Sequence, residues 1–289
     1  MERIGVLVHP TRPVQAGVEV LKEWTAEHGL ELVQIPAGGQ PRVAPPGEVD
    51  ACDLMTALGG DGTILKALHV SARTRTPVLG VAYGSLGALT TIAQTELRAG
   101  LDRFAAGDWH AQRLPALDID AGGRRLASAI NDVVVARAGG TQLVLDVCVD
   151  GELYVRLAGD GVVIATPLGS SAYSMAAGGP VLAIGTTGFV CTPLAMHGGC
   201  APPLVVADGR EVTLELHPGH EGFFVDVDGF RVQTDVHRLA ITCEHGYATL
   251  VAIEDSGTGL LRLRERGLIG DSPRVLGREH RALHIEAAS

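Results

Sequence analysis

Short apolar runs alternate with amphipathic segments before residue 110 of the chain. Continuous apolar runs predict buried strands, and apolar residues three and four apart predict helices. The predicted strands are Ile4–Val8, Leu30–Ile35, Leu54–Leu58 and Val78–Val81, and the predicted helices are Val14–His28 and Gly62–Ser71. Strands separated by helices predict an α/β, doubly wound parallel sheet, whose ligands lie beyond the carboxyl ends of the strands.

The pattern changes to β structure after Arg113. The predicted strands are Leu117–Asp120, Leu126–Arg137, Leu143–Val149, Glu152–Leu157, Val162–Ala165, Val212–Leu216, Phe223–Val227, Arg231–Gln233, Leu239–Cys243 and Thr249–Ile253. Asp150-Gly151 and Asp228-Gly229 are hairpin signals between neighbouring strands. We therefore expect this half to be a β-rich domain of the sandwich type.

These patterns divide the chain into an α/β domain at residues 1–111 and a β-rich domain at residues 112–255. Residues 256–269 contain a predicted helix, Leu260–Arg266, that returns to the first domain. Residues 270–289 are polar and predict a loose tail. With 289 residues, of which 46% are hydrophobic, the chain is long and apolar enough for two buried cores.

Composition excludes several classes of function. No apolar run reaches about 18 residues and the N-terminus lacks a signal-peptide pattern, so we expect neither a membrane span nor secretion. Five scattered cysteines without a CxxC pair predict a reducing, cytoplasmic environment, and they argue against a disulfide framework or a zinc site. The net charge of −10 argues against a nucleic-acid partner.

A glycine-rich turn, Gly59-Gly60-Asp61-Gly62-Thr63, follows the third predicted strand and opens a helix. Glycines let backbone N–H groups approach an anion closely, and a helix N-terminus favours phosphate. A carboxylate in such a cradle would repel phosphate unless it holds a metal ion or accepts a proton from an attacking hydroxyl. Both roles belong to phosphoryl transfer. The alternative is an ordinary turn in which Asp61 caps the helix.

Two further segments carry polar groups suited to a nucleotide. Asp160–Ser174 again places a strand before a turn of small residues, and its hydroxyls could bond ribose or phosphate oxygens. The hydroxyl-bearing residues are Thr166, Ser170, Ser171, Tyr173 and Ser174. Asn131-Asp132 pairs an amide with a carboxylate, which suits the two hydroxyls of a ribose. The alternatives are a serine-capped helix start at Ser170 or Ser171 and a polar step in a strand.

In this order and spacing, the motifs resemble the NAD kinase family, within a wider group that includes diacylglycerol, sphingosine and 6-phosphofructo kinases. The resemblance covers roughly Ile4 to Gly267. Its anchors are Gly59–Thr63, Asn131-Asp132, Ala158–Gly161, Thr166–Ser174, Gly178-Gly179-Pro180 and Val227-Asp228-Gly229. It implies an NAD kinase-like fold and ATP-dependent phosphorylation of a hydroxyl group, with Mg²⁺ or another divalent cation accompanying ATP and no metal ligand assigned in the chain.

The resemblance assigns the catalytic and phosphate-binding roles to the first glycine-rich turn. Asp61 would accept the proton of the adenosine ribose 2′-hydroxyl of NAD as that oxygen attacks the γ-phosphate, giving NADP. Residues Gly59, Gly60, Gly62 and Thr63 would cradle the ATP phosphates. Lys66, one turn into the helix, would neutralise phosphate charge; its alternative is a solvated helix lysine.

The resemblance also implies an acceptor site in the β-rich domain. Asn131 and Asp132 would hold the dinucleotide, although the family usually has Glu where Asp132 stands. Gln142 would face the acceptor, and Asp160 would lie near the nicotinamide riboside. The loop around the adenine and ribose would comprise Ser171, Ala172, Tyr173, Ser174 and Ala176, following Thr166, with Tyr173 as a stacking surface. The resemblance also implies homodimers or homotetramers formed through this domain, with small-molecule nucleotides as partners.

Three of the departures from the family pattern concern single residues of the acceptor pocket. Ala82 replaces a usual Asn, Ala88 replaces an aromatic residue, and Phe230 replaces a polar residue after Asp-Gly. We interpret these changes as a reshaped acceptor pocket beside an intact phosphoryl-transfer apparatus. The sequence therefore favours an NAD kinase over two alternatives. One is a sister kinase acting on a smaller adenine nucleoside or nucleotide, and the other is a catalytically silent nucleotide sensor.

Overall fold

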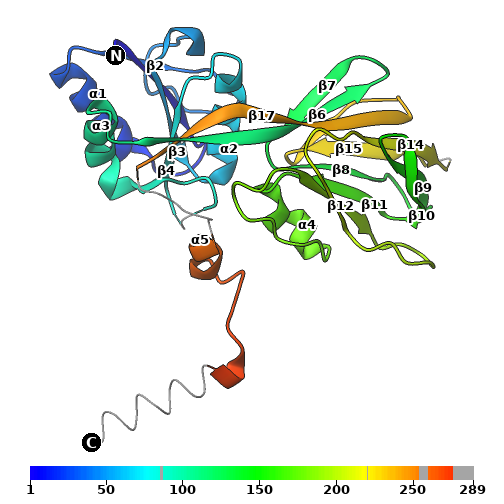
Figure 1. The fold of residues 1–289 in the computed structure, drawn as a ribbon. Helices are drawn as coiled ribbons and strands as arrows, with labels where there is room; N and C mark the ends of the chain where they lie inside the picture. The colour runs from blue at the N-terminus through cyan, green and yellow to red at the C-terminus, as the bar shows by residue number, and fades with distance from the viewer. Residues whose placement is uncertain (85–86, 220, 254–259, 276–289) are drawn as a thin grey trace, which may run out of the picture.

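The computed structural model describes residues 1–84, 87–219, 221–253 and 260–275. Strands and helices alternate in its first part (Figure 1). In chain order they are β1 (Arg3–Val8), α1 (Gln15–Glu27), β2 (Glu31–Gln34), the 3₁₀ turn η1 (Val49–Ala51), β3 (Leu54–Gly59), α2 (Asp61–Ala72), β4 (Val78–Ala82), β5 (Ile92–Ala93), η2 (Gln94–Glu96) and α3 (Leu97–Ala105). Four of the strands lie side by side in the order β4-β3-β1-β2, and all three pairings are parallel.

Helices cover both faces of this parallel sheet, as Figure 1 shows. Val18, Leu21 and Trp24 recur at intervals of three on α1 and are buried, together with α3, against one face. Ile64 and Leu68 of α2 are buried against the other face. Because both faces are covered, strand β3 is buried along its whole length, which explains its continuous apolar sequence.

The rest of the chain forms mainly antiparallel strands. They are β6 (His110–Ala121), β7 (Arg125–Ala129), β8 (Asp132–Arg137), β9 (Leu143–Val149), β10 (Glu152–Gly159), β11 (Gly161–Ala165), β12 (Phe189–Leu194), β13 (Leu204–Val206), β14 (Val212–Pro218), β15 (Phe223–Val227), β16 (Phe230–Val232) and β17 (Arg238–Ala252). The helical elements are η3 (Gly169–Ser171), α4 (Tyr173–Ala176) and α5 (Leu260–Glu265). No described helix is long and apolar enough to cross a membrane.

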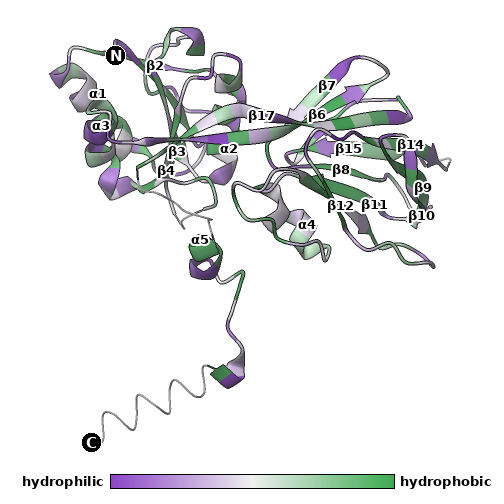
Figure 2. Ribbon diagram, in the orientation of Figure 1, coloured by the Kyte–Doolittle hydropathy of each residue, from purple (hydrophilic) through white to green (hydrophobic). Residues whose placement is uncertain are grey.

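Two sheets pack face to face in this second part. One is six-stranded, in the order β13-β12-β11-β8-β15-β16. Val133 and Val135 of β8 face a core that also contains Leu145, Leu214 and Ile241 of the opposing sheet. Figure 2 shows hydrophobic residues concentrated on the strands around β8 and β12. The expected fold class, a doubly wound α/β part followed by a β sandwich, is confirmed.

The opposing sheet of the sandwich continues into the parallel sheet. Its path runs β10-β9-β14-β17-β4-β3-β1-β2, and β6 pairs with β17 along both parts. Leu239 near the start of β17 pairs with Leu214, whereas Leu250 near its end pairs with Val78 of β4. The long strands β6 and β17 therefore join the two parts of the molecule, as Figure 1 shows.

Several strand predictions need correction. The predicted strand Leu126–Arg137 is two strands, β7 and β8, separated at Ile130 and Asn131, because the chain passes there from one sheet to the other. The two predicted strands at Leu239–Cys243 and Thr249–Ile253 are one strand, β17, with an irregularity between Glu244 and Ala248. The sequence analysis also missed α3, β12 and β13.

Both hairpin predictions are confirmed. Asp150 and Gly151 have φ of 49° and 81°, and Asp228 and Gly229 have φ of 50° and 78°. Two successive positive φ angles are the signature of the type I′ turn that suits a twisted hairpin. The predicted helix at Leu260–Arg266 is present as α5, and residues 276–289 of the predicted tail lie outside the described residues.

Candidate functional site

A cavity opens at the point where the strand order of the parallel sheet reverses. From β1 the chain adds β2 on one side and β3 on the other, so the carboxyl ends of β1 and β3 flank a topological switch point. The cavity has a volume of about 300 Å³. Its lining includes His9 and Arg12 after β1, Gly60, Asp61 and Gly62 after β3, and Lys66 on α2.

The glycine-rich turn presents backbone N–H groups to this cavity. Gly60 caps α2, and its carbonyl oxygen accepts hydrogen bonds from the N–H groups of Thr63 and Ile64 at 2.9 and 3.1 Å. The N–H groups of Asp61 and Gly62 come earlier in the helix and have no intrahelical acceptor. A Cβ atom at Gly62 would meet no heavy atom within 4 Å, so a ligand can approach its backbone closely. This geometry suits an anion.

Asp61 is held by the segment that follows β4. Its Oδ2 accepts a hydrogen bond from the N–H of Ala88, and its Oδ1 accepts one from Leu89, both at 2.9 Å. A Cβ atom at Gly87 would collide with this carboxylate. The alternative in which Asp61 caps its own helix is wrong, because Gly60 occupies the cap and no side-chain capping bond is present there.

Three basic side chains, His9, Arg12 and Lys66, line the cavity beside the turn, and His9 and Arg12 escaped the sequence analysis. Arg12 donates to the carbonyl oxygen of Tyr83 and lies beside Gly60. His9 accepts hydrogen bonds at Nδ1 from the N–H groups of Thr11 and Arg12, at 3.2 and 3.1 Å. Burial, followed by the charges of Arg12 and Lys66, lowers the pKa of His9 below its ordinary value. The sequence could have indicated both residues, because they come directly after the first strand, at the ligand-binding edge of the sheet.

Phe230 lies in this same cavity. The Nζ of Lys66 is 5.4 Å from the centroid of its ring, which is within the range of a cation–π contact. The sequence analysis grouped Phe230 with changes on the acceptor side, away from the phosphoryl-transfer apparatus. That grouping is wrong for Phe230, because its ring lines the cavity that contains Asp61. The hairpin of β15 and β16 brings the ring across from the second part of the molecule.

The other two departures are close to Asp61 or to its strand. Ala82 is buried at the end of β4 and pairs with Gly59 of β3. Ala88 donates its N–H to Asp61 and also lines a small hollow with Leu168, Ser171 and Leu263. The segment that carries Ala88 therefore touches both the Asp61 carboxylate and the loop after β11.

Asn131 and Asp132 are positioned by a buried carboxylate, Asp228. Its oxygens accept hydrogen bonds from the N–H groups of Ile130, Asn131 and Asp132 at 2.8, 2.7 and 3.1 Å. They also contact Nε2 of His69, on α2, at 2.6 Å. Asp228 thus ties the loop before β8 and the β15–β16 hairpin to α2. The sequence analysis included Asp228 in a motif but assigned it no role.

Asp132 is a buried carboxyl group close to this network. It is 7% exposed, and burial, followed by the negative charge of Asp228, raises its pKa to about 7. Such a group changes charge near neutral pH and can either donate or accept a hydrogen bond. Both roles suit a ribose hydroxyl.

The loop after β11 divides into buried and accessible residues. Thr166 is fully buried and donates to the carbonyl oxygen of Ile130 at 2.6 Å. Ser174 is also fully buried and bonds Thr192 Oγ1 at 2.8 Å. These hydroxyls hold the loop, which leaves the predicted ligand contacts to the less buried residues. They are Ser171, whose Oγ donates to Leu168 at 3.1 Å, and the exposed Ala172, Tyr173 and Ala176.

Two predicted acceptor residues lie elsewhere. Asp160 precedes β11 and accepts a hydrogen bond from Nε of Arg137 at 2.6 Å, whereas Thr166 follows the other end of that strand. Gln142 is exposed and contacts Nδ1 of His197. Asp160 lies opposite Arg137, six residues along β8 from Asn131, so Asp160 and Asn131 are about 20 Å apart along the sheet. One chain therefore does not bring all the predicted acceptor residues together.

Comparisons with known proteins agree with this fold. Residues 40–109 match the ATP-NAD kinase N-terminal domain, and residues 130–254 match the ATP-NAD kinase C-terminal domain. An NAD kinase from Koribacter versatilis is 34% identical over 242 residues, which are 79% of this chain and 85% of that protein.

Two solved structures share the fold. Yeast NADH kinase complexed with NADH has a TM-score of 0.80 at 22% identity, covering 94% of this chain and 89% of that one. An NAD kinase from Archaeoglobus fulgidus in complex with ATP has a TM-score of 0.74 at 23% identity, covering 93% of this chain and 100% of that one. The resemblance found in the sequence is confirmed, and the chain belongs to the NAD kinase family.

Proposed function

We propose that this protein transfers the γ-phosphoryl group of ATP to the 2′-hydroxyl of the adenosine ribose of NAD, which gives NADP. Membership of the NAD kinase family supports an enzyme that phosphorylates a hydroxyl group. The observation that carries the proposal is the Asp61 carboxylate, fixed by the Ala88 and Leu89 N–H groups at the edge of a positively charged cavity.

The phosphates of ATP bind at the N-terminus of α2. The free N–H groups of Asp61 and Gly62 donate hydrogen bonds to them, and Lys66 and Arg12 contribute positive charge. Asp61 is the only carboxylate that lines the described cavity, so the protein offers too few oxygen ligands for a divalent ion of its own. A Mg²⁺ ion therefore enters with ATP, and it supplies neutralisation of phosphate charge when bound.

The nucleoside of ATP occupies a second cavity beside the first. This cavity has a volume of about 500 Å³ and shares Gly38 and Gln40 with the phosphate cavity. Gln34, Pro36 and Arg42 line the remainder, which lies beyond the end of β2. The proline- and glycine-rich loop after that strand thus forms the wall of the donor site.

Asp61 acts as the general base. Each of its oxygens accepts one backbone hydrogen bond and retains a further lone pair, so the carboxylate is oriented and can still accept a proton. Asn131 and Asp132 orient the ribose, while Ser171 and Tyr173 contact the adenosine. The proton passes to Asp61 as the 2′-oxygen attacks the γ-phosphorus, whose bond to the β–γ bridging oxygen breaks so that ADP leaves. The negative charge on the phosphoryl oxygens faces Lys66 and Arg12.

Turnover by an Asp61 variant tests this assignment. Asp61→Asn cannot accept a proton, and we expect turnover of NAD with MgATP to fall roughly 10²–10⁴-fold. Because Asn also retains only one oxygen for the two N–H donors, ATP affinity and the free energy of unfolding are measured beside turnover. Asp50→Asn, at an exposed carboxylate paired with Arg73, is the matched control. Turnover near that of the unmodified protein would remove Asp61 from the mechanism.

A panel of acceptors identifies the substrate. NAD, NADH, AMP and adenosine are each supplied with MgATP, and the phosphorylated product is quantified by chromatography. We expect NAD to give the highest kcat/KM. Turnover of adenosine or AMP with inert NAD would instead establish the sister kinase. Nucleotide binding without any turnover would establish the sensor.

We propose further that the enzyme is a cytoplasmic homodimer or homotetramer. All five cysteines are free, which suits a reducing compartment. The separation of Asp160 from Asn131 supports an acceptor site that a second copy completes. Sedimentation would give the assembly, and mixing two inactive variants, Asp61→Asn and Asp160→Asn, would restore activity only if one copy supplies Asp61 and its partner supplies Asp160. A monomer, or a mixture that stays inactive, would refute the shared site.

A further inference from the structure

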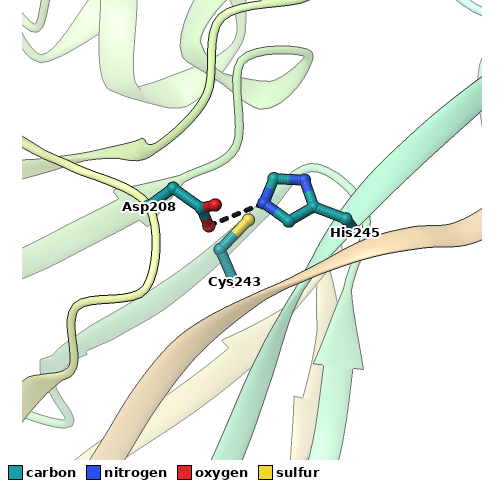
Figure 3. A group of neighbouring side chains, drawn as sticks. All are labelled: Asp208, Cys243 and His245. Carbon is teal, nitrogen blue, oxygen red and sulfur yellow. Dashed lines mark ion pairs between the residues drawn. The ribbon is translucent and has the colours of Figure 1, made fainter.

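A carboxylate, a thiol and an imidazole converge on the side of the sandwich. Asp208 lies in the connection between β13 and β14, and Cys243 and His245 lie two residues apart on β17. Oδ1 of Asp208 is 2.6 Å from Nε2 of His245. Figure 3 shows the Cys243 sulfur directed toward this contact. One donor atom from each residue lies within 4.8 Å of the donor atoms of the other two.

The strand geometry explains why two of the donors share one side. Side chains two residues apart on a strand point to the same face, so Cys243 and His245 are neighbours there. The irregularity of β17 begins at Glu244 and changes the course of the strand beside them. Asp208 comes from 35 positions earlier in the chain, which is why cysteine and histidine spacing gave no metal signature.

An exposed ion pair accounts for only part of this arrangement. It explains the contact of Asp208 with His245, and that contact lowers the pKa of Asp208. It does not explain the thiol that faces both groups. A nucleophilic cysteine does not fit either, because burial raises the pKa of Cys243 to about 11 and disfavours the reactive thiolate.

Oxygen, nitrogen and sulfur donors in one group match the ligand preferences of zinc. Zinc bonds of about 2.0–2.3 Å in tetrahedral geometry bring donor atoms within about 3–4 Å of one another. Three donors already within 4.8 Å reach that geometry by small side-chain rotations. With three protein ligands the fourth position remains open to water.

A second group of potential ligands offers a useful contrast. Asp146 lies near Glu215 and His217, but both of its oxygens accept hydrogen bonds from Arg156 at 2.7 Å. Nε2 of His217 is 3.9 Å from the nearer oxygen. Because an arginine already neutralises Asp146, this group is a poorer metal site, and His217 serves as a matched control.

We propose that Asp208, Cys243 and His245 bind one Zn²⁺ ion. The ion replaces the thiol proton and, where the imidazole is protonated, the proton on its coordinating nitrogen, and both are released to solvent. It then bonds the thiolate, the imidazole nitrogen and a carboxylate oxygen. Asp208 lies on the connection from the six-stranded sheet to the opposing sheet, so the ion fastens this connection to β17. The site is separate from the cavity of Asp61.

Zinc titration of the full-length, chelator-treated protein tests the proposal. We expect one Zn²⁺ per chain by elemental mass spectrometry. Competition with a chromophoric chelator should show that Cys243→Ser and His245→Ala each weaken binding at least about 100-fold, since even groups that only orient a ligand contribute about 10–100-fold. His217→Ala and Cys200→Ser, at a second exposed histidine and an exposed cysteine, should leave affinity unchanged.

Two further measurements separate ligation from a folding defect. Co²⁺ in place of Zn²⁺ should give a thiolate-to-metal charge-transfer band that Cys243→Ser abolishes. Hydrogen exchange at residues 207–211 should slow on adding Zn²⁺ to the unmodified protein and not to His245→Ala. His245 is exposed, so its replacement should leave the unfolding curve without metal unchanged. Absence of stoichiometric zinc, or binding that survives both Cys243→Ser and His245→Ala, would overturn the proposal.

Discussion

Asp132 illustrates how one residue is controlled by its neighbour. The side chain of Asp228 is 1% exposed and accepts three backbone hydrogen bonds together with the contact to His69. Asp132 is itself buried and lies beside that negative charge, and both raise the pKa of its carboxyl group, to about 7. The two carboxyls therefore differ: Asp228 holds the loop, whereas Asp132 changes charge near neutral pH.

Replacing Asp132 should change the pH dependence of stability. A carboxyl whose pKa is higher in the folded protein contributes stability at low pH, and that contribution is lost as pH rises from about 4 through about 7. Asp132→Asn removes the group that titrates. We therefore expect the stability of the variant relative to the unmodified protein to increase between pH 5 and 8, and then to level off.

Urea unfolding at pH 5, 6, 7 and 8 measures this difference. Titrating groups that do not interact with Asp132 are common to both proteins, so they cancel in the comparison. Asp226→Asn, at a carboxylate on β15 paired with Arg231, is the control and should give a difference that varies little with pH. A difference for Asp132→Asn that stays flat across this range would contradict the raised pKa.

At the scale of elements, the hairpin of β15 and β16 docks against α2. Its turn residue Asp228 contacts His69, and Phe230 two positions later lies over Lys66. Lys66 and His69 are three residues apart and so share one face of α2. The docking places Phe230 in the cavity of Asp61 and the loop before β8 beside α2.

Removing the Asp228 carboxylate should loosen this docking. Asp228→Ala leaves three backbone N–H groups of the Ile130–Asp132 segment without their acceptor, and it removes the carboxylate that contacts Nε2 of His69. Breaking a buried interaction of this kind costs roughly 3–5 kcal/mol of unfolding free energy. Asp226→Ala, in the more exposed pair with Arg231 on the same hairpin, should cost only about 0–1 kcal/mol. Equal effects in urea unfolding would refute the role assigned to Asp228.

The sequence predicted those elements that local patterns determine. The alternation of β1, α1, β2, β3, α2 and β4 and both type I′ turns followed from apolar periodicity and Asp-Gly pairs. The break at Ile130 did not, because the group that satisfies its backbone is Asp228, 98 positions away. At the site, Asp61 was recognisable from its glycines, whereas Arg12 and Phe230 reach the cavity only through the packing of separate segments.

At the scale of the whole molecule, two long strands make the cores interdependent. Leu117 of β6 and Leu239 of β17 belong to the sandwich core. Leu114 and Leu250 of the same two strands belong to the core beneath α2. If β6 and β17 unfold in one part, apolar surface becomes exposed in the other part. We therefore expect the chain to unfold in one cooperative transition.

Tryptophan fluorescence can test this cooperativity, because a mutation in the sandwich lies far from both tryptophans. Trp24 and Trp109 both pack in the core beneath α1, so tryptophan fluorescence reports the α/β part alone. Leu239→Ala, in the sandwich, should destabilise the protein by about 2–5 kcal/mol and lower the urea midpoint seen by tryptophan fluorescence as much as that seen by circular dichroism. Leu153→Ala, at an exposed leucine of β10, should shift neither signal. A fluorescence midpoint that stays in place while the circular dichroism midpoint falls would mean that the two parts unfold separately, and that β6 and β17 connect them without coupling them.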